Sequence, residues 1–336
     1  MTTRNVSLLL LLALTTVAAS AAGPEPKYKT PRTENGQPDL QGVWNFSSDV
    51  PLQRAPVFAE KKVLTREEFD TQAAGRRNGL RAVVTFAPIN DVGLDWLDNR
   101  PASDDLRSSL ISYPENGRLP KLIDGVRRVP SVEDIGALLG ESKDGPPPAL
   151  LALISAFEGG AKASFENFGA AERCLTGENV PFAPQSDDNY VQIIQSKDHV
   201  VFLTDGARRI IPIDARPRAG DAFRTWSGDS RGHWEAGTLV VETRNFNRRA
   251  RSFGGAGNAY EKVVVERFTR GSKGAIEYEA TVVDPKTFTD TIVLSFPMAK
   301  VDDGHIYEWA CHEGNYSLKN ALSGARAEEE RAMNVK

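Results

Sequence analysis

The segment "EKVVVERFTRGSKGAIEYEATVV", residues 261–283, shows the strand pattern of this chain most clearly. In its second half, apolar and polar side chains take turns: Ile276, Tyr278, Ala280 and Val282 alternate with Glu277, Glu279 and Thr281. A period of two is typical of a β-strand that buries one face and exposes the other to water. Between the two halves, Gly271–Gly274 is a polar stretch bounded by glycines, which suits a turn. The segment therefore predicts an antiparallel β-hairpin.

Further segments of the chain show the same strand–turn–strand pattern. They are "VQIIQSKDHVVFLTD" (191–205), which turns at Lys197 and Asp198, "HWEAGTLVVETRNF" (233–246), which bends at Ala236–Gly237, and "DTIVLSFPMAKVDDGHIYEWACHEG" (290–314), which turns at Asp303–Gly304. An Asp–Gly pair is favoured in tight hairpins. Successive antiparallel hairpins favour a β-barrel or a strongly curved sheet, so we expect a mainly β fold of that kind.

The first strand is expected in "DLQGVWNFS" (39–47). Its G-x-W is similar to the motif that opens lipocalin-like barrels, where the tryptophan plugs one end. A large aromatic side chain at a barrel end is usually part of the core, so Trp44 is expected to be structural, with a substrate contact as the alternative.

Three regions have the features of helices instead. In "LTREEFDTQAAGRR" (64–77), Thr65 and Glu68 have the spacing of a capping box at a helix start. Residues 131–170 contain a triple proline and an apolar run at helical spacing, which predicts a helical insertion. The tail 317–336 is polar and helix-prone, and we expect it to pack on the barrel or on a neighbouring subunit, which leaves a homodimer open.

The N-terminus has the features of a cleaved secretory signal. Residues 1–22 contain Arg4, an apolar run of 12 residues from Val6 to Val17 and small residues at an A-x-A-like cleavage site. A helix that spans a membrane needs about 20 apolar residues, so this run is too short to be one. We therefore expect residues 23–336 to form a single domain in the periplasm or outside the cell.

Charge and motifs exclude several classes of function. Removal of Arg4 with the signal changes the formal net charge from −4 to −5. The basic clusters "RRII" (208–211) and "NRRARSF" (247–253) are short and interrupted, which favours solvated strand edges or an anion-binding mouth over a nucleic-acid surface. The chain has no second apolar stretch of membrane length, no dinucleotide or Walker glycine loop, no G-x-S-x-G and no H-E-x-x-H. The sequence therefore gives no support for a second membrane-length segment, a nucleotide-binding loop, a Ser-His-Asp hydrolase or an H-E-x-x-H zinc site.

The chain has two cysteines, Cys174 and Cys311. An oxidising exported setting favours a disulfide bond between them. Two buried thiols, or one reactive thiol, are the alternatives.

The candidate catalytic residues lie in three polar stretches. His233 and Glu235 are two residues apart and therefore share a face of a strand. If they point inward, they are a base and the carboxylate that orients it; if they point outward, they are rim residues. "CHEGNY" (311–316) adds His312 and Tyr316, and Arg244 begins "RNFNRRARSF", which either holds an anion or is a solvated loop. The candidate substrate contacts are Trp44, Trp226, Asn245, Phe246 and Asn315. A metal site made of the two histidines and a carboxylate is an open alternative to a site without metal.

Several of these segments resemble a widespread family of exported bacterial proteins, most of which have no assigned function. The matching segments are "PDLQGVWNFSS" (38–48), "RSSLISYPENGRLPKL" (107–122), "RCLTGENVP" (173–181), "YVQIIQSKDHVVFL" (190–203), "RTWSGDSRGHWEAGTLVVETRNF" (224–246), "VVVERFTR" (263–270), "EATVVDPKTFT" (279–289) and "YEWACHEGNYSLKNALSGARAEE" (307–329). The chain departs from the family pattern in two places. The family's strand opening is W-E-G-D-T-L, whereas residues 234–239 are W-E-A-G-T-L and lack the aspartate. Residues 131–168 also fall outside the family pattern.

The resemblance implies export, a β-rich fold and a link to lignin breakdown. Similar proteins of sphingomonad-like bacteria are associated with lignin-derived aromatic dimers, and one such reaction removes formaldehyde from a hydroxymethyl side chain without a cofactor. The expected function is therefore a cofactor-independent lyase for a hydrophobic aromatic molecule. In that reaction His233, oriented by Glu235, is the base, and Tyr316 or Arg244 stabilises the leaving phenoxide. A non-catalytic small-ligand binding module and an envelope scaffold are the alternatives.

Overall fold

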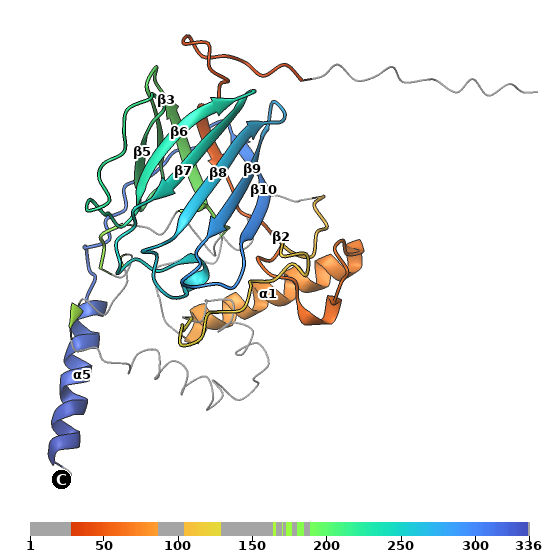
Figure 1. Ribbon diagram of the computed structural model, residues 1–336. Coiled ribbons are helices and arrows are strands. Elements are labelled where there is room, and N and C mark those ends of the chain that lie inside the picture. The colour runs from red at the N-terminus through yellow and green to blue at the C-terminus, as the bar shows by residue number, and fades with distance from the viewer. Residues whose placement is uncertain are drawn as a thin grey trace, which may run out of the picture.

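The computed structural model describes residues 28–86, 104–128, 164–165, 170, 173–176, 180–184 and 189–334. This part of the chain is mainly β and forms an antiparallel barrel that is nearly closed, so the predicted fold class is confirmed (Figure 1). Nine strands are neighbours in the sheet in the order β5-β4-β3-β1-β10-β9-β8-β7-β6. The short strand β2 is outside this order and pairs with β10.

The elements have the following bounds. The strands are β1 (Gly42–Asn45), β2 (Ile111–Tyr113), β3 (Tyr190–Gln195), β4 (His199–Leu203), β5 (Arg208–Pro212), β6 (Asp229–Glu235), β7 (Thr238–Arg244), β8 (Val263–Arg270), β9 (Ala275–Val283) and β10 (Ile292–Val301). The helices are α1 (Arg66–Phe86) and α5 (Ser317–Asn334), with short 3-10 helices at Pro56–Phe58 and Phe253–Gly255.

The hairpins β3–β4, β6–β7 and β8–β9 form where the sequence predicts them. The side chains of Ile276, Tyr278, Ala280 and Val282 are buried, as the alternation along β9 requires. At the β6–β7 bend, Ala236 and Gly237 both have positive φ, 46° and 97°. Positive φ at both central residues is the conformation of a type I′ turn, one of the two turns favoured in two-residue hairpins.

The prediction of a hairpin at Asp303–Gly304 is wrong. β10 ends at Val301, and residues 304–310 beyond the turn form no strand. Instead, the backbone N–H of Tyr307 donates to the carboxylate of Asp205, between β4 and β5, at 3.2 Å. The reason is tertiary. β10 already pairs with β9 on one edge and with β1 on the other, where Val301 faces Val43, so no edge of β10 is left for a returning strand.

Aromatic side chains fill the barrel interior. Ring centroids are 4.8–6.5 Å apart in a cluster made of Phe46, Phe182, Phe202, Phe268, Tyr278 and Phe296. Such spacing is that of packed rings in a protein core. Trp44 is completely buried, and its indole N–H donates to the carbonyl of Leu40 at 2.8 Å. Trp44 is thus a core residue, as the G-x-W motif predicts, and its side chain has no surface exposed to a ligand.

A buried ion pair crosses this apolar core. The guanidinium of Arg209 on β5 donates to both carboxylate oxygens of Glu266 on β8, and both side chains are almost fully buried. The hydroxyl of Tyr278 donates to Glu266 at 2.9 Å and accepts from the backbone N–H of Phe182 at 2.9 Å. Burial, together with the neighbouring Glu266 carboxylate, raises the pKa of Tyr278 well above its ordinary value. The hydroxyl therefore stays protonated as a donor.

The barrel is not hydrogen-bonded all the way round, because β5 and β6 are the two ends of the strand order. They nevertheless lie against each other at Gly232. A Cβ atom there would be 2.9 Å from a methyl of Ile213 and 3.1 Å from one of Ile211. Glycine therefore lets β6 approach β5 closely. We call the line between β5 and β6 the seam.

The helices lie outside the barrel. At the start of α1 the capping box forms as expected: the N–H of Glu68 donates to the Thr65 hydroxyl at 3.2 Å, and the N–H of Thr65 donates to the Glu68 carboxylate at 2.8 Å. α5 forms in the tail as expected, but it is largely exposed and runs away from the barrel (Figure 1). No helix in the described ranges is long and apolar enough to cross a membrane.

Two predictions concern residues that the structure leaves out. The signal at 1–22 lies outside the described residues, and so does almost all of the insertion expected at 131–170.

Candidate functional site

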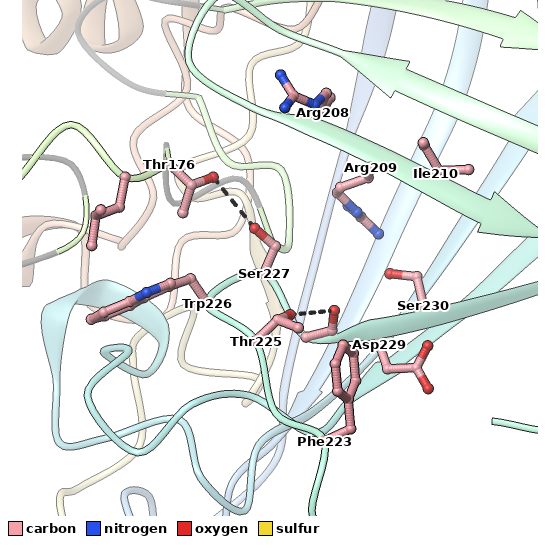
Figure 2. Close-up of a pocket in the computed structure, with 12 residues that line it drawn as sticks. Thr176, Arg208, Arg209, Ile210, Phe223, Thr225, Trp226, Ser227, Asp229 and Ser230 are labelled. Atoms are coloured by element: carbon pink, nitrogen blue, oxygen red, sulfur yellow. Dashed lines mark hydrogen bonds between the residues drawn. The ribbon is translucent and has the colours of Figure 1, made fainter. Parts of the chain in front are cut away.

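A cavity of about 360 Å³ opens at one end of the seam (Figure 2). One wall is residues 208–210 of β5. The opposite wall is residues 225–230, which lead into β6, with Phe223 at its edge. Leu175 and Thr176 complete the lining. We call this space the seam cavity.

The wall that precedes β6 is held by backbone contacts with the strand's neighbours. The N–H of Thr225 donates to the carbonyl of Asn245 at 3.2 Å, and the N–H of Asn247 donates back to the carbonyl of Thr225 at 2.7 Å. Gly228 has a φ of 74°, and a Cβ atom on it would lie 2.6 Å from a methyl of Thr243. Only glycine allows both this conformation and this approach, so Gly228 sets how the wall enters β6.

The apolar side of the seam cavity contains two aromatic rings, Trp226 and Phe223. Trp226 is partly buried against the core, and the guanidinium of Arg173 lies 5.5 Å from its ring centre. Phe223 is 61% exposed although it lines the cavity. Figure 2 shows the two rings on either side of Thr225. The sequence places Trp226 among the substrate contacts, and the structure places it in the cavity lining.

The polar side contains three charged residues in different states. Arg209 is buried and paired with Glu266. Asp229 contacts the guanidinium of Arg231 and lies 4.0 Å from that of Arg218. Arg208 is exposed, and within the described part of the chain its side chain forms no hydrogen bond or ion pair. The charge that remains available to a ligand is therefore the positive charge of Arg208.

A disulfide bond joins Cys174 to Cys311, which confirms the predicted pairing. It ties the residues just before Leu175 and Thr176 to the stretch that leads into α5. The side-chain amide of Asn315 donates to the sulfur of Cys174 at 3.3 Å. Asn315 therefore contacts the disulfide and does not line the cavity.

His233 and Glu235 point away from the barrel interior. Their side chains are 58% and 47% exposed, and His233 Nε2 lies 2.7 Å from Glu235 Oε1. The hydrogen bond from His233 lowers the pKa of Glu235, and Arg267 at 3.1 Å adds to this effect. Along β6 the buried positions are Ser230 and Gly232, so alternation turns His233 outward. The expected pairing is present, but in the outward orientation and outside the cavity lining.

The other candidate residues are not brought together either. Arg244 is exposed and pairs with Glu242 at 2.6 Å, and His312 and Tyr316 are exposed in the segment before α5. Asn245 and Phe246 are buried, and Phe246 belongs to the core. None of these residues lines the seam cavity. Within the described ranges, no group of three or more His, Cys, Asp or Glu side chains is placed to hold a metal ion.

Sequence reasoning missed the cavity itself. Phe223 lies in no quoted segment, and Asp229 lies in the family-like segment 224–246 but had no role assigned to it. Both residues meet β5 only because the two ends of the sheet approach each other. One signal was available: the cluster "RRII" (208–211), which the sequence assigns to a strand edge or an anion-binding mouth, supplies Arg208 to the cavity.

Comparison with family models, with curated proteins and with solved structures finds no match for this chain. The resemblance to exported bacterial proteins therefore stays a prediction, and the function has to be argued from the geometry.

His233→Ala is expected to leave folding stability nearly unchanged and to have little effect on any ligand of the seam cavity, which His233 does not line. The side chain is exposed, and its contact with Glu235 is a surface pair, which water and salt screen and which contributes little to stability. Urea unfolding and calorimetric titration of the variant check this. A loss of binding or of turnover beyond about tenfold would return His233 to the site.

Proposed function

We propose that this protein binds a small aromatic molecule in the seam cavity. The observation that carries the proposal is the pairing of two aromatic rings, Trp226 and Phe223, with an unpaired guanidinium in one concave space. Ligand sites are typically clefts of about 300–1,000 Å³ with an apolar lining and a few polar groups. The seam cavity, at about 360 Å³, has the size of a one-ring or small two-ring ligand.

The filled barrel supports placing the ligand at the seam. In the described part, the interior is occupied by packed aromatic rings and by the Arg209–Glu266 pair. A ligand space inside the barrel, as in lipocalins, would require the packed rings and the Arg209–Glu266 pair to separate. The seam cavity requires no such rearrangement, because its walls are already separate.

Export to the periplasm or the cell exterior is part of the proposal. It is supported by the signal pattern in residues 1–22 and by the Cys174–Cys311 bond. Disulfide bonds persist in oxidising compartments and are rare in the cytosol.

A lyase that releases formaldehyde from a lignin-derived dimer is the second candidate function. The observation that favours it is that ionisable groups lie beside the aromatic rings of the cavity. In such a reaction a base takes the proton of the hydroxymethyl group and the carbon–carbon bond breaks to release formaldehyde. The electron pair of that bond forms a carbon–carbon double bond, while the neighbouring carbon–oxygen bond breaks and its pair leaves with a phenoxide, which the proton taken by the base can then neutralise.

The cavity lining changes the residues assigned to this reaction. Asp229 is the one carboxylate among the lining residues and replaces His233 as the candidate base, and Arg208 replaces Arg244 and Tyr316 beside the phenoxide. Incubation of the protein with hydroxymethyl-bearing dimers, followed by a formaldehyde assay, tests this candidate. Binding without formaldehyde release would end the lyase proposal and leave the binding proposal in place.

Trp226→Ala is expected to weaken binding of a lignin-type aromatic such as vanillin by about tenfold. Loss of a ring contact costs about 0.5–1.5 kcal/mol beyond the area it buries, and about 1.4 kcal/mol is a factor of ten. Isothermal titration calorimetry measures the affinity.

Trp309→Ala is the matched control, because Trp309 is an exposed tryptophan outside the cavity lining. Equal affinity in both variants, or no binding to the unaltered protein, would contradict the proposal.

A further inference from the structure

The edge of β5 that faces the seam has unused main-chain groups. The N–H of Thr204 donates to the carbonyl of Ala207, and the N–H of Ile213 donates to that of Asp198. Odd-numbered residues of β5 therefore direct their main-chain groups toward β4. In an antiparallel ladder the residues between them point the other way, so the N–H groups of Arg208 and Ile210 face the seam.

The facing edge of β6 has the same character. Glu235 and Thr238 flank the two-residue turn and form a pair, as do Asp229 and Arg244 at the other end of the ladder. The pair that flanks a two-residue turn is hydrogen-bonded, and so is every second pair beyond it. The N–H of Ser230 lies between such pairs and faces the seam. In the described part, no hydrogen bond joins β5 to β6.

These main-chain donors lie at the seam cavity, because Arg208, Ile210 and Ser230 all line it. Main-chain N–H groups without partners attract an anion, and a guanidinium presents a planar array of donors that fits a carboxylate. The carboxylate already present, Asp229, contacts Arg231 and lies 4.0 Å from the guanidinium of Arg218, so its charge is balanced within the protein.

We propose that the seam cavity is specific for aromatic carboxylates, with Arg208 as the residue that determines this specificity. The carboxylate group of the ligand lies at the seam against the Arg208 guanidinium and the free N–H groups of β5 and β6. The ring lies against Trp226 and Phe223. This inference rests on the proposed function, because both concern the same cavity.

The position of Arg208 explains why an arginine suits this role. Strand alternation turns Arg209 inward, where Glu266 neutralises it, and turns Arg208 outward at the cavity mouth. Figure 2 shows the two side chains diverging from neighbouring positions of β5. Two adjacent arginines thus have separate roles: one is fixed in the core, and the other is available to a ligand.

The test compares ligands that share a ring and differ in whether they carry a carboxylate. Benzoate and cinnamate are titrated into the full protein beside benzyl alcohol and cinnamyl alcohol, which keep the ring and lose the carboxylate. We expect each carboxylate to bind at least tenfold more tightly than its alcohol. Arg208→Gln is expected to lower carboxylate affinity by about tenfold and to leave alcohol affinity unchanged, so the preference is lost.

Arg267→Gln is the matched control, because Arg267 is an arginine on the outer face that contacts Glu235 and does not line the cavity. It should keep the full preference for carboxylates. Trp226→Ala should weaken carboxylates and alcohols alike.

The possible outcomes separate the two proposals. Equal affinity for carboxylates and alcohols in the unaltered protein would overturn the specificity and leave the binding function standing. A preference that survives Arg208→Gln would overturn the role of Arg208. Failure of every ligand to bind would end the proposed function as well. A thermal melt of each variant confirms that it is folded.

Discussion

Glu266→Ala is expected to destabilise the folded protein by about 3–5 kcal/mol, the range typical of breaking a buried ion pair. The carboxylate of Glu266 is completely buried and accepts hydrogen bonds from Arg209 and from the hydroxyl of Tyr278. Without it, the Arg209 guanidinium remains as an uncompensated charge between the rings of Phe182 and Phe202, whose centres lie 5.6 and 5.3 Å away. Urea unfolding followed by circular dichroism measures the loss.

A double variant distinguishes a lost partner from lost packing. Replacing both members of a buried pair by apolar residues of similar volume is often neutral or stabilising, because the cost of desolvating two charges disappears. Arg209→Met combined with Glu266→Leu is therefore expected to recover most of the stability lost in Glu266→Ala. A Glu266→Ala variant within about 1 kcal/mol of the unaltered protein would show that the pair is not as tightly buried as its geometry indicates.

Removing the disulfide with Cys174→Ser and Cys311→Ser is expected to cost about 2–5 kcal/mol. The bond joins residues 137 positions apart, and the chain-entropy model gives about 5 kcal/mol for a loop of that length. The same bond fixes the start of the segment that carries Leu175 and Thr176 into the cavity lining, so ligand affinity should fall as well.

The measurement is urea unfolding of the double serine variant beside the oxidised protein. Dithiothreitol is the control: it should destabilise the unaltered protein and leave the serine variant unchanged. Equal stability of the two proteins, or two free thiols in the unreduced protein, would contradict the prediction.

Local pattern was sufficient for the hairpins β3–β4, β6–β7 and β8–β9 and for the start of α1. In residues 261–283, apolar and polar side chains alternate, and this indicates which face of the strand is buried, because side chains of a strand alternate between its faces. The apolar side chains, which are buried, are Ile276, Tyr278, Ala280 and Val282. The turn residues Ala236 and Gly237 and the capping box of Thr65 and Glu68 act within a few positions of one another. The cysteine count favoured the Cys174–Cys311 bond, because two cysteines can form one intramolecular bond, but it left free thiols open until the structure showed the pair.

The strand order, the orientation of β6 and the site needed the tertiary structure. The Asp303–Gly304 turn favours a hairpin locally, but β1 occupies the edge of β10 that a returning strand would need. Spacing placed His233 and Glu235 on one face, and only the packing of Ser230 and Gly232 against the core turned that face outward. The seam cavity exists because β5 and β6, whose sequences contain no pairing signal for each other, meet as the two unbonded ends of one curved sheet. A pattern read along the chain reports contacts between near neighbours, whereas closure of a barrel joins residues that no local rule relates.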